Sequence, residues 1–306
     1  MKGRILSILR STPEIVSGET LKARLGTSRV SIWKHIRKLK ELGYRIEATP
    51  KGYRLHDSPD ALYPWEFGAR EPRIHYYDEI PSTMDVARDL ARKGCPHLSI
   101  VIAERQHKGR GRLQRSWHSS TGGLYFTVVL RPRLAPALSP RINLAASLYM
   151  AQTLRQLHGI QAQVKWPNDV LVADRKISGM LAEMEAEVDR VVFVNVGIGL
   201  NVNNDPPTDL PQAVSVKQLL GRRVERKAIL EDFLQRLESG LQTDDFDTVI
   251  AEWKKNSISL NRPVRVVMHH SVVEGTAVDV DDNGALVLES DDGTTQKIFY
   301  GDCFPR

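Results

Sequence analysis

Residues 17–43, S-G-E-T-L-K-A-R-L-G-T-S-R-V-S-I-W-K-H-I-R-K-L-K-E-L-G, contain two helical patterns separated by a glycine turn. The first helix is expected to end at Gly26, because glycine readily adopts the left-handed conformation that closes many helices. Thr27 or Ser28 can cap the second helix, and Gly43 ends it. A helix, a glycine turn and a basic second helix together form the pattern of a helix-turn-helix.

The second of these helices carries an apolar row and a polar row. The apolar row recurs every three residues and is predicted to be buried: Val30, Trp33, Ile36, Leu39 and Leu42. The other row is predicted to face DNA: Arg29, Ser31, Ile32, Lys34, His35 and Lys38.

A predicted hairpin follows the second helix. Residues 44–48 and 53–55 read as short strands around the turn Thr49-Pro50-Lys51-Gly52. A hairpin in this position makes a winged helix, and its tip can reach a phosphate or the minor groove. Lys51 at the tip and Ser28 at the helix start therefore join the candidate DNA-binding residues.

The positive charge of the chain is confined to its first part. Residues 1–55 hold 13 Lys/Arg and 4 Asp/Glu, a balance of +9, whereas residues 56–306 hold 30 and 33, a balance of −3. Such a local field predicts a polyanion partner, and with the helix-turn-helix pattern it favours DNA. The alternatives are a solvated basic face and a small helical module that binds protein.

Composition otherwise indicates an ordinary globular protein. No run of about 18 apolar residues predicts a membrane span. The N-terminus has no long apolar stretch and no small-residue cleavage site, so no signal peptide is expected. Cys95 and Cys303 lie far apart without metal spacing, which favours a reducing compartment and a cytoplasmic location.

The sequence pattern suggests four segments: a winged helix-turn-helix at 1–58, a linker at 59–72, a mixed α and β domain at 73–258 and a C-terminal domain of short strands at 259–306. Prolines in the linker argue against a continuous helix across it. In the third segment, strands are predicted at 98–104, 124–130, 170–172, 177–181 and 190–202, and helices at 85–93, 141–157, 226–241 and 246–255. Hairpins without strict strand–helix alternation favour an α+β fold with a largely antiparallel sheet.

The last segment contains only short predicted strands. Asn283-Gly284 and Asp292-Gly293 are strong hairpin turns between them. A small β-barrel is predicted from the strands at 264–268, 273–278, 285–288 and 295–299.

A loop rich in glycine and arginine runs from Gln106 to Trp117, Q-H-K-G-R-G-R-L-Q-R-S-W, directly after a predicted strand. Gly109 and Gly111 allow backbone N–H groups to turn toward one ligand, and the arginines supply charge and bidentate donors. Such a loop suits a phosphate or a carboxylate. It lacks both the Walker sequence and the complete dinucleotide fingerprint. The alternatives are an arginine-rich surface loop and a further nucleic-acid contact.

Three further clusters offer polar groups or close backbone approach. Residues 165–169, K-W-P-N-D, form a polar turn, and Lys176 follows at the mouth of a buried strand, where a salt bridge is the plainer interpretation. Glycines in residues 197–203 indicate close approach of a ligand or backbone, or a bulge. Hydroxyls in residues 81–84 can bind a ligand or cap a helix. No nucleophilic triad or metal motif is visible, so the predicted chemistry is positioning and charge stabilisation, as adenylation requires.

Taken in order, these clusters resemble those of the biotin–protein ligases. With the winged helix in front, the chain resembles the bifunctional bacterial form, which also represses biotin synthesis genes, and the resemblance covers essentially the whole chain. The matching segments are S-T at 82–83, Q-x-x-G-R-G-R-x-x-R-x-W at 106–117, K-W-P-N-D at 165–169, K-I-S-G at 176–179 and G-I-G-L-N at 197–201.

The resemblance implies an α+β multidomain protein. Its central mixed sheet domain would be like class II aminoacyl-tRNA synthetases, and its C-terminal domain would be an SH3-like β-barrel. The implied reaction joins biotin and ATP, with Mg²⁺, into biotinyl-5′-AMP and transfers biotin to a lysine of biotin carboxyl carrier protein. The adenylate-bound form would dimerise and bind operator DNA.

The resemblance also implies roles for individual residues. Biotin would be bound by Ser82, Thr83, Met84, Gln106, Arg110, Gly111, Arg112, Lys176 and Gly179. The nucleotide would be bound by Gly109, Trp117, Asn168, Gly199, Asn201 and Arg306. Catalysis would use Lys176, Arg112, Arg110, Lys165 and Asp169, with Asp169 aiding attack by the acceptor lysine.

Two positions depart from the family pattern. Leu113-Gln114 stands where the family loop usually has a residue followed by glycine, which stiffens the loop. Met84 stands where the family often has asparagine. The alternatives are a lipoate or octanoate ligase, a transcription factor that senses biotin without efficient catalysis, and a ligase whose DNA domain no longer binds a specific operator.

Overall fold

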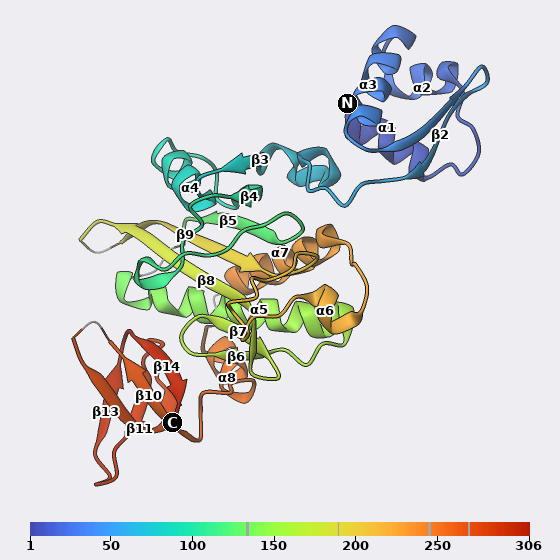
Figure 1. The fold of residues 1–306 in the computed structure, drawn as a ribbon. Coiled ribbons are helices and arrows are strands. Elements are labelled where there is room, and N and C mark those ends of the chain that lie inside the picture. The colour runs from blue at the N-terminus through green and yellow to red at the C-terminus, as the bar shows by residue number, and fades with distance from the viewer. Residues whose placement is uncertain (133–134, 189, 244–245, 269) are drawn as a thin grey trace. The chain divides into compact units, whose positions relative to one another are not determined.

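The computed structural model describes residues 1–132, 135–188, 190–243, 246–268 and 270–306 (Figure 1). These residues divide into two compact units, an N-terminal unit at 1–72 and a larger unit at 73–306. Among the described residues, no helix is both long and apolar enough to cross a membrane.

The N-terminal unit contains the predicted three helices and hairpin. Its elements are α1 (Lys2–Arg10), α2 (Gly18–Leu25), α3 (Arg29–Glu41), β1 (Arg45–Thr49) and β2 (Gly52–Asp57), with β1 and β2 antiparallel. Gly26 ends α2 at φ 62°, and the Ser28 side chain caps α3 by accepting a hydrogen bond from the Ser31 N–H. The predicted end of α2 and the predicted start of α3 are therefore confirmed.

The predicted faces of α3 are partly wrong. Ile32 is buried with Ile36 and Leu39 in the core of the unit, whereas Val30 and Trp33 are exposed. A strict three-residue spacing drifts around a helix with 3.6 residues per turn, so the buried stripe follows the spacing i, i+4, i+7 instead. Because the Ile32 side chain lies in the core, the structure corrects its assignment as a DNA-binding residue.

Residues 59–72 pack against the helices of the same unit. They contain the short 3-10 helix η1 (Pro64–Glu66), and the adjoining η2 spans Gly68–Arg73. Arg10 donates to the Glu66 carboxylate at 2.9 and 3.0 Å, and the Trp65 indole N–H donates to the Tyr44 hydroxyl at 3.0 Å. These side-chain contacts make the segment part of the N-terminal unit.

A seven-stranded sheet forms the centre of the larger unit. Its order is β3-β4-β5-β9-β8-β7-β6, in which only β3 and β4 are parallel. The strands are β3 (Ile74–Ile80), β4 (Ser99–Gln106), β5 (Leu124–Leu130), β6 (Gln163–Lys165), β7 (Asp169–Val172), β8 (Arg175–Ala186) and β9 (Val191–Leu200). The prediction of a largely antiparallel sheet is confirmed. The edge strands β3 and β6 were not predicted from the sequence.

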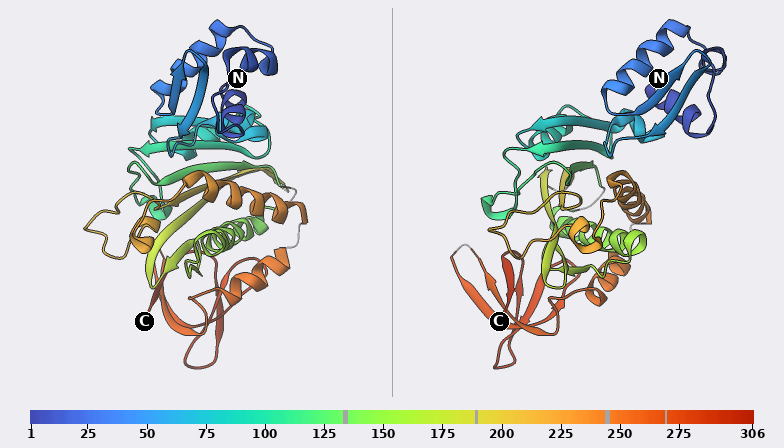
Figure 2. Two further views of the ribbon diagram at one scale, coloured as in Figure 1. Left: turned by 90° about the vertical axis from the view of Figure 1, so that its right-hand side faces the viewer. Right: turned by 45° about the vertical axis from the view of Figure 1, so that its right-hand side comes forward.

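Helices cover both faces of this sheet (Figures 1 and 2). On β5, Phe126 packs against Phe233 of α7 on one face, and the next residue, Thr127, bonds to Thr83 of α4 on the other. The helices are α4 (Thr83–Arg92), α5 (Ser139–His158), α6 (Val216–Leu220), α7 (Arg226–Thr243) and α8 (Phe246–Lys255), with short 3-10 turns η3 (Arg112–Gln114) and η4 (Pro136–Leu138). The alternation along β5 places the α4 face toward the candidate site.

The C-terminal segment forms an antiparallel sheet with the order β13-β12-β11-β10-β14. Its strands are β10 (Arg262–Val267), β11 (Val272–Val280), β12 (Leu286–Glu289), β13 (Thr295–Ile298) and β14 (Asp302–Pro305). Within the part of the chain that the structure describes, no pairing joins the edge strands β13 and β14. The described sheet is therefore open, and the predicted small β-barrel is not found.

Candidate active site

A cavity of about 140 Å³ opens on the α4 face of the large sheet. Strands β8 and β9, the start of α4 and the loop 106–117 all contribute to its walls. All nine residues predicted to bind biotin line it: Ser82, Thr83, Met84, Gln106, Arg110, Gly111, Arg112, Lys176 and Gly179.

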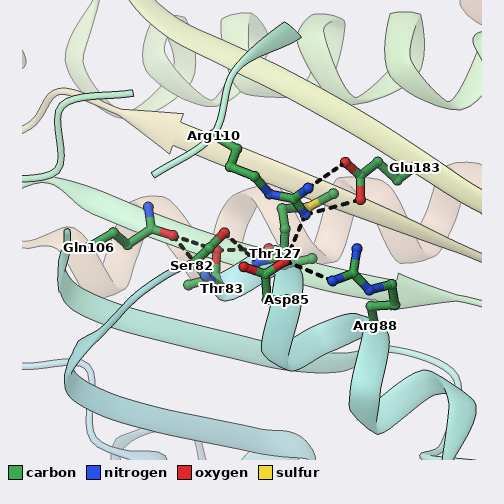
Figure 3. Close-up of polar contacts among 9 residues, drawn as sticks. Ser82, Thr83, Asp85, Arg88, Gln106, Arg110, Thr127 and Glu183 are labelled. Carbon is green, nitrogen blue, oxygen red and sulfur yellow. Dashed lines mark hydrogen bonds and ion pairs between the residues drawn. The ribbon is translucent and has the colours of Figure 1, made fainter. Parts of the chain in front are cut away.

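The start of α4 brings a fixed set of polar groups to this cavity (Figure 3). Ser82 caps the helix by accepting a hydrogen bond from the Met84 N–H at 3.2 Å. The Gln106 carbonyl oxygen accepts from the Thr83 N–H at 2.7 Å and from its hydroxyl at 3.1 Å. The buried Thr127 hydroxyl donates to the Thr83 hydroxyl at 2.9 Å. The hydroxyl of Ser82 can therefore cap α4 and still line the cavity. The hydrogen bonds among Gln106, Thr83 and Thr127 hold the neighbouring polar groups in place.

Gly109 and Gly111 allow other residues of the loop to pack closely against their backbone. A Cβ atom on Gly109 would lie 2.4 Å from the Trp117 carbonyl oxygen. The Gly111 N–H donates to the Arg115 carbonyl at 2.8 Å, so the prediction that this N–H turns toward a ligand is wrong. Leu113 and Gln114 both adopt positive φ, 51° and 58°, a conformation that costs energy in residues other than glycine.

Arg110 is held by carboxylates on two different elements (Figure 3). Its guanidinium group lies 3.1 Å from Asp85 of α4 and 3.1 Å from Glu183 of β8. Arg88 also contacts Asp85, at 2.9 Å. These contacts tie the first half of the loop to the body of the unit.

Arg112 ties the second half of the loop to the C-terminal sheet. Its guanidinium donates to the Asn168 side-chain oxygen and to the Gly301 carbonyl, both at 3.0 Å, and lies 3.8 Å from Asp302. Arg115 forms an ion pair with the same Asp302. Burial lowers the pKa of the Arg112 guanidinium, and the Asp302 and Asp169 carboxylates oppose that shift. An arginine starts so far above neutral pH that this group stays charged.

Trp117 and Lys176 close one end of the cavity. A Cβ atom on Gly199 would lie 2.3 Å from the Trp117 ring, and one on Gly179 would lie 3.0 Å from it. The Lys176 ammonium lies 5.4 Å from the centre of this ring and 2.7 Å from the Asp169 carboxylate. Gly199 of β9 therefore allows close approach, as predicted, and the group that approaches it is the protein's own indole ring.

A second cavity, of about 660 Å³, adjoins the first. The two cavities share five lining residues: Arg115, Ser116, Trp117, Asp169 and Lys176. Lys165 and Asn201 also line the larger cavity, and the Lys165 ammonium lies 5.2 Å from the centre of the Phe304 ring. Among the predicted nucleotide residues, Asn168 and Gly199 line the smaller cavity, and Trp117 lines both.

Two predicted nucleotide residues are not brought to either cavity. Arg306 pairs with Glu274 at 3.3 Å on the C-terminal sheet, and Gly109 packs within the loop against the Trp117 carbonyl. Three carboxylates that were not predicted as site residues form ion pairs with the loop arginines: Asp85, Glu183 and Asp302. They carry no motif, and only the folded sheet brings them near residues distant in the chain.

The remaining DNA-binding candidates lie on exposed or half-buried surface of the N-terminal unit: Ser28, Arg29, Ser31, Lys34, His35, Lys38 and Lys51. Arg29 lies 3.5 Å from Glu19, and Lys38 lies 3.3 Å from Glu41. Burial lowers the pKa of His35, and the N-terminal amine and Lys2 lower it further. This histidine is therefore neutral at pH 7, and lysine and arginine supply the charge of the helix.

Comparison with known proteins agrees with this architecture. Three family models match: HTH domain over residues 3–54, Biotin/lipoate A/B protein ligase family over 76–203, and Biotin protein ligase C terminal domain over 259–306. The fold and its two adjoining cavities thus define a ligase of the biotin/lipoate type with an N-terminal helix-turn-helix.

Full-length relatives narrow this class. The chain is 35% identical to the bifunctional ligase/repressor BirA of Bacillus subtilis, over 94% of this chain and 93% of that protein. It is 29% identical to the protein of the same name from Escherichia coli, over 94% and 92%. The chain belongs to the family of bifunctional ligase/repressor proteins.

A solved structure supports the assignment of the larger unit. Biotin protein ligase from Aquifex aeolicus, in complex with biotin and ATP, matches with a TM-score of 0.66 and 27% identity. The match covers 76% of this chain and 98% of that one.

Proposed function

We propose that this protein joins biotin to ATP, giving biotinyl-5′-AMP and pyrophosphate, and then transfers biotin to a lysine of biotin carboxyl carrier protein. One observation carries the proposal: the two cavities meet at Lys176, Asp169 and Trp117. An acid in the smaller cavity and a nucleotide in the larger one would have their reacting groups at this junction.

In the first step, a biotin carboxylate oxygen attacks the α-phosphorus of ATP, and the bond to pyrophosphate breaks. Lys176 lies at the junction and would stabilise negative charge on the carboxylate and the α-phosphate. Arg112 keeps its charge despite burial, and Lys165 in the larger cavity would contact the phosphates. Binding and orientation supply the rest of the catalysis, because the attacking group is already a carboxylate.

In the second step, the amine of the acceptor lysine attacks the carbonyl carbon of the mixed anhydride, and AMP leaves. The amine must lose a proton to become nucleophilic, and Asp169 is the carboxylate that lines both cavities. The loop 106–117 covers the smaller cavity, where it would exclude water from the labile anhydride.

Mg²⁺ would accompany ATP. Among the described residues, no three His, Cys, Asp or Glu side chains converge to hold a metal, while Asp169, Asp174 and Asp209 line the larger cavity. This donor set fits an ion held mainly by phosphate oxygens and water, the mode that magnesium favours.

The N-terminal unit would bind operator DNA and repress biotin synthesis genes when biotinyl-5′-AMP is bound. The balance of +9 over residues 1–55 and the winged helix support this role. We further propose that the adenylate-bound chain dimerises, which would match a palindromic operator.

We also propose finer assignments of the fold. The domains would be 1–58, 73–258 and 259–306, with residues 59–72 linking the first domain to the second. The mixed sheet would be related to class II aminoacyl-tRNA synthetases, and the C-terminal open sheet would be SH3-like.

The test incubates the purified full chain with biotin and α-labelled ATP, without acceptor. Retained biotinyl-AMP and released pyrophosphate are expected with biotin and not with lipoate. Lys176→Ala should abolish most of the product, whereas Lys255→Ala should not, because Lys255 pairs with Glu252 away from both cavities. No adenylate with either acid would contradict the proposal and favour a sensor without catalysis.

A further inference from the structure

Two large apolar side chains lie exposed on the most basic helix of the N-terminal unit. Val30 is 63% exposed and Trp33 is 49% exposed, both in the first two turns of α3. The buried stripe of α3 is Ile32, Ile36 and Leu39. At 100° per residue, Val30 lies roughly 150° from the centre of that stripe, and Trp33 lies roughly 90° from it, on the flank of the helix. They are therefore not part of the core of this unit.

The surroundings of Val30 and Trp33 are strongly basic. Lys34, Arg37 and Lys38 share the outward side of α3 and are exposed. The Arg37 guanidinium lies 4.9 Å from the centre of the Trp33 ring, a cation–π contact that orients the indole. A second copy of this face would bring like charges together. The charge complementarity therefore favours a polyanion as the occupant.

In a helix-turn-helix, the N-terminal residues of the second helix contact base edges, and basic residues contact phosphates. A valine methyl cannot form a hydrogen bond with a base. The apolar group that the major groove offers is the C5-methyl of thymine. We propose that Val30 and Trp33 read sequence by packing against thymine methyl groups, so that they determine part of the operator specificity. The inference rests on the proposed DNA binding of this unit.

The first stage of the test establishes DNA binding. The full chain, incubated with biotin and ATP, is used to select duplexes from a random pool at fixed salt. Failure to enrich any duplex would overturn the DNA-binding proposal, and this inference with it. An enriched duplex provides the probe for the second stage.

The second stage removes thymine methyl groups one at a time. Each thymine of the selected duplex is replaced by deoxyuridine, and Kd is measured by fluorescence anisotropy. At one or more positions the replacement should weaken binding about fourfold, the effect of one buried methyl group. Val30→Ala or Trp33→Ala should weaken binding to the thymine duplex. At the sensitive position, the variant should then bind the thymine and uridine duplexes with equal Kd.

Matched controls separate contact from damage to the fold. Trp33→Phe retains an aromatic ring and should preserve more of the sensitivity to uridine than Trp33→Ala. Lys51→Ala, at the tip of the wing, should weaken thymine and uridine duplexes equally. The thermal unfolding midpoints of Val30→Ala and Trp33→Ala should match that of the parent, because both side chains are exposed.

Three results would overturn the inference while leaving DNA binding intact. The first is equal affinity for thymine and uridine at every position. The second is the same sensitivity to uridine in the parent and in both alanine variants. The third is loss of a dimer by Trp33→Ala in sedimentation without DNA, which would assign the surface to a second copy of the chain.

Discussion

The Lys176 ammonium lies 2.7 Å from the Asp169 carboxylate, at the place where the two cavities of the larger unit meet. The pair joins adjacent strands, because β7 begins at Asp169 and β8 begins at Arg175. Each partner limits the position of the other. Lys176 is proposed to act in adenylate formation and Asp169 in transfer to the acceptor, so both half-reactions depend on this ion pair.

Substitutions of this pair should separate the half-reactions. Lys176→Ala should slow adenylate formation about 10²–10³-fold, the effect of removing one donor to developing charge. Asp169→Asn should slow transfer to the acceptor lysine about 10²-fold, because a proton acceptor is lost. Single-turnover measurements of each step provide the test. An Asp169→Asn variant that forms no adenylate but transfers supplied biotinyl-AMP normally would contradict these roles.

Gln114 should respond to substitution through its backbone conformation. Its φ of 58° favours glycine, so Gln114→Gly should leave the unfolding midpoint unchanged or raise it slightly. Gln114→Val places a β-branched residue in the same conformation and should be less stable than Gln114→Gly by about 1–2 kcal/mol. Thermal unfolding of both variants compares them directly. Equal midpoints for glycine and valine would show that the loop relaxes at no cost.

Gly199 provides the space for the Trp117 indole. Gly199→Ala would place a Cβ atom 2.3 Å from the ring, and the indole would have to leave its position on β9. Because Trp117 lines both cavities, KM for biotin and KM for ATP should each rise about tenfold or more. Gly197→Ala is the matched control, since its Cβ would meet the flexible Met84 side chain in the smaller cavity and should raise KM for biotin alone.

Asn204 should position Asn201 for the nucleotide. The Val202 N–H donates to the Asn204 side-chain oxygen at 3.0 Å, and the Asn204 amide group then donates to the Asn201 oxygen at 2.9 Å. Asn201 lines the larger cavity, and because its oxygen is held by Asn204, its amide N–H groups would be the ones to contact a nucleotide. Asn204→Asp would reverse the Asn201 amide and should raise KM for ATP about tenfold, with KM for biotin unchanged.

Asn203 supplies the control for this prediction. Its side chain bonds to the Val224 backbone in the same buried turn. Asn203→Asp should therefore lower stability more than it changes nucleotide binding. A rise in KM for ATP equal to that of Asn204→Asp would indicate general damage to the turn.

Stability should fall as pH falls through about 6.5. Burial lowers the pKa of His97, nearby Arg73 lowers it further, and the His97 Nδ1 accepts the Arg131 backbone N–H at 3.0 Å. Between the lowered pKa and the ordinary value near 6.5, the unfolded chain binds more protons than the folded chain. The free energy of unfolding thus decreases over this window and becomes independent of this group below it.

Urea unfolding from pH 5 to pH 8 measures the effect. His35, His75 and His158 also have pKa values lowered by burial, so they contribute in the same direction. His97→Gln retains an acceptor that does not titrate in this range and should reduce the slope. An unchanged slope in this variant would show that His97 does not contribute.

Several helices and strands were predicted correctly from local sequence patterns, whereas one helix face was not. The helix-turn-helix, the strand Leu124–Leu130 and the helix Phe246–Lys255 follow from local periodicity and turn residues, and the structure has them. The candidate biotin residues occur in short ordered motifs, and they all line one cavity. By contrast, the outward side of α3 was misjudged, because a three-residue spacing approximates a helical face only over a short distance.

The sequence by itself determined most of the helices and strands, the basic N-terminal unit and the candidate residues of the site, because periodicity, turns and motifs are local properties. Only the tertiary structure decided which carboxylates hold the loop. Asp85, Glu183 and Asp302 reach Arg110, Arg112 and Arg115 from α4, β8 and β14. Ion pairs between residues far apart in the chain depend on how sheets and helices pack, and no local pattern encodes that packing.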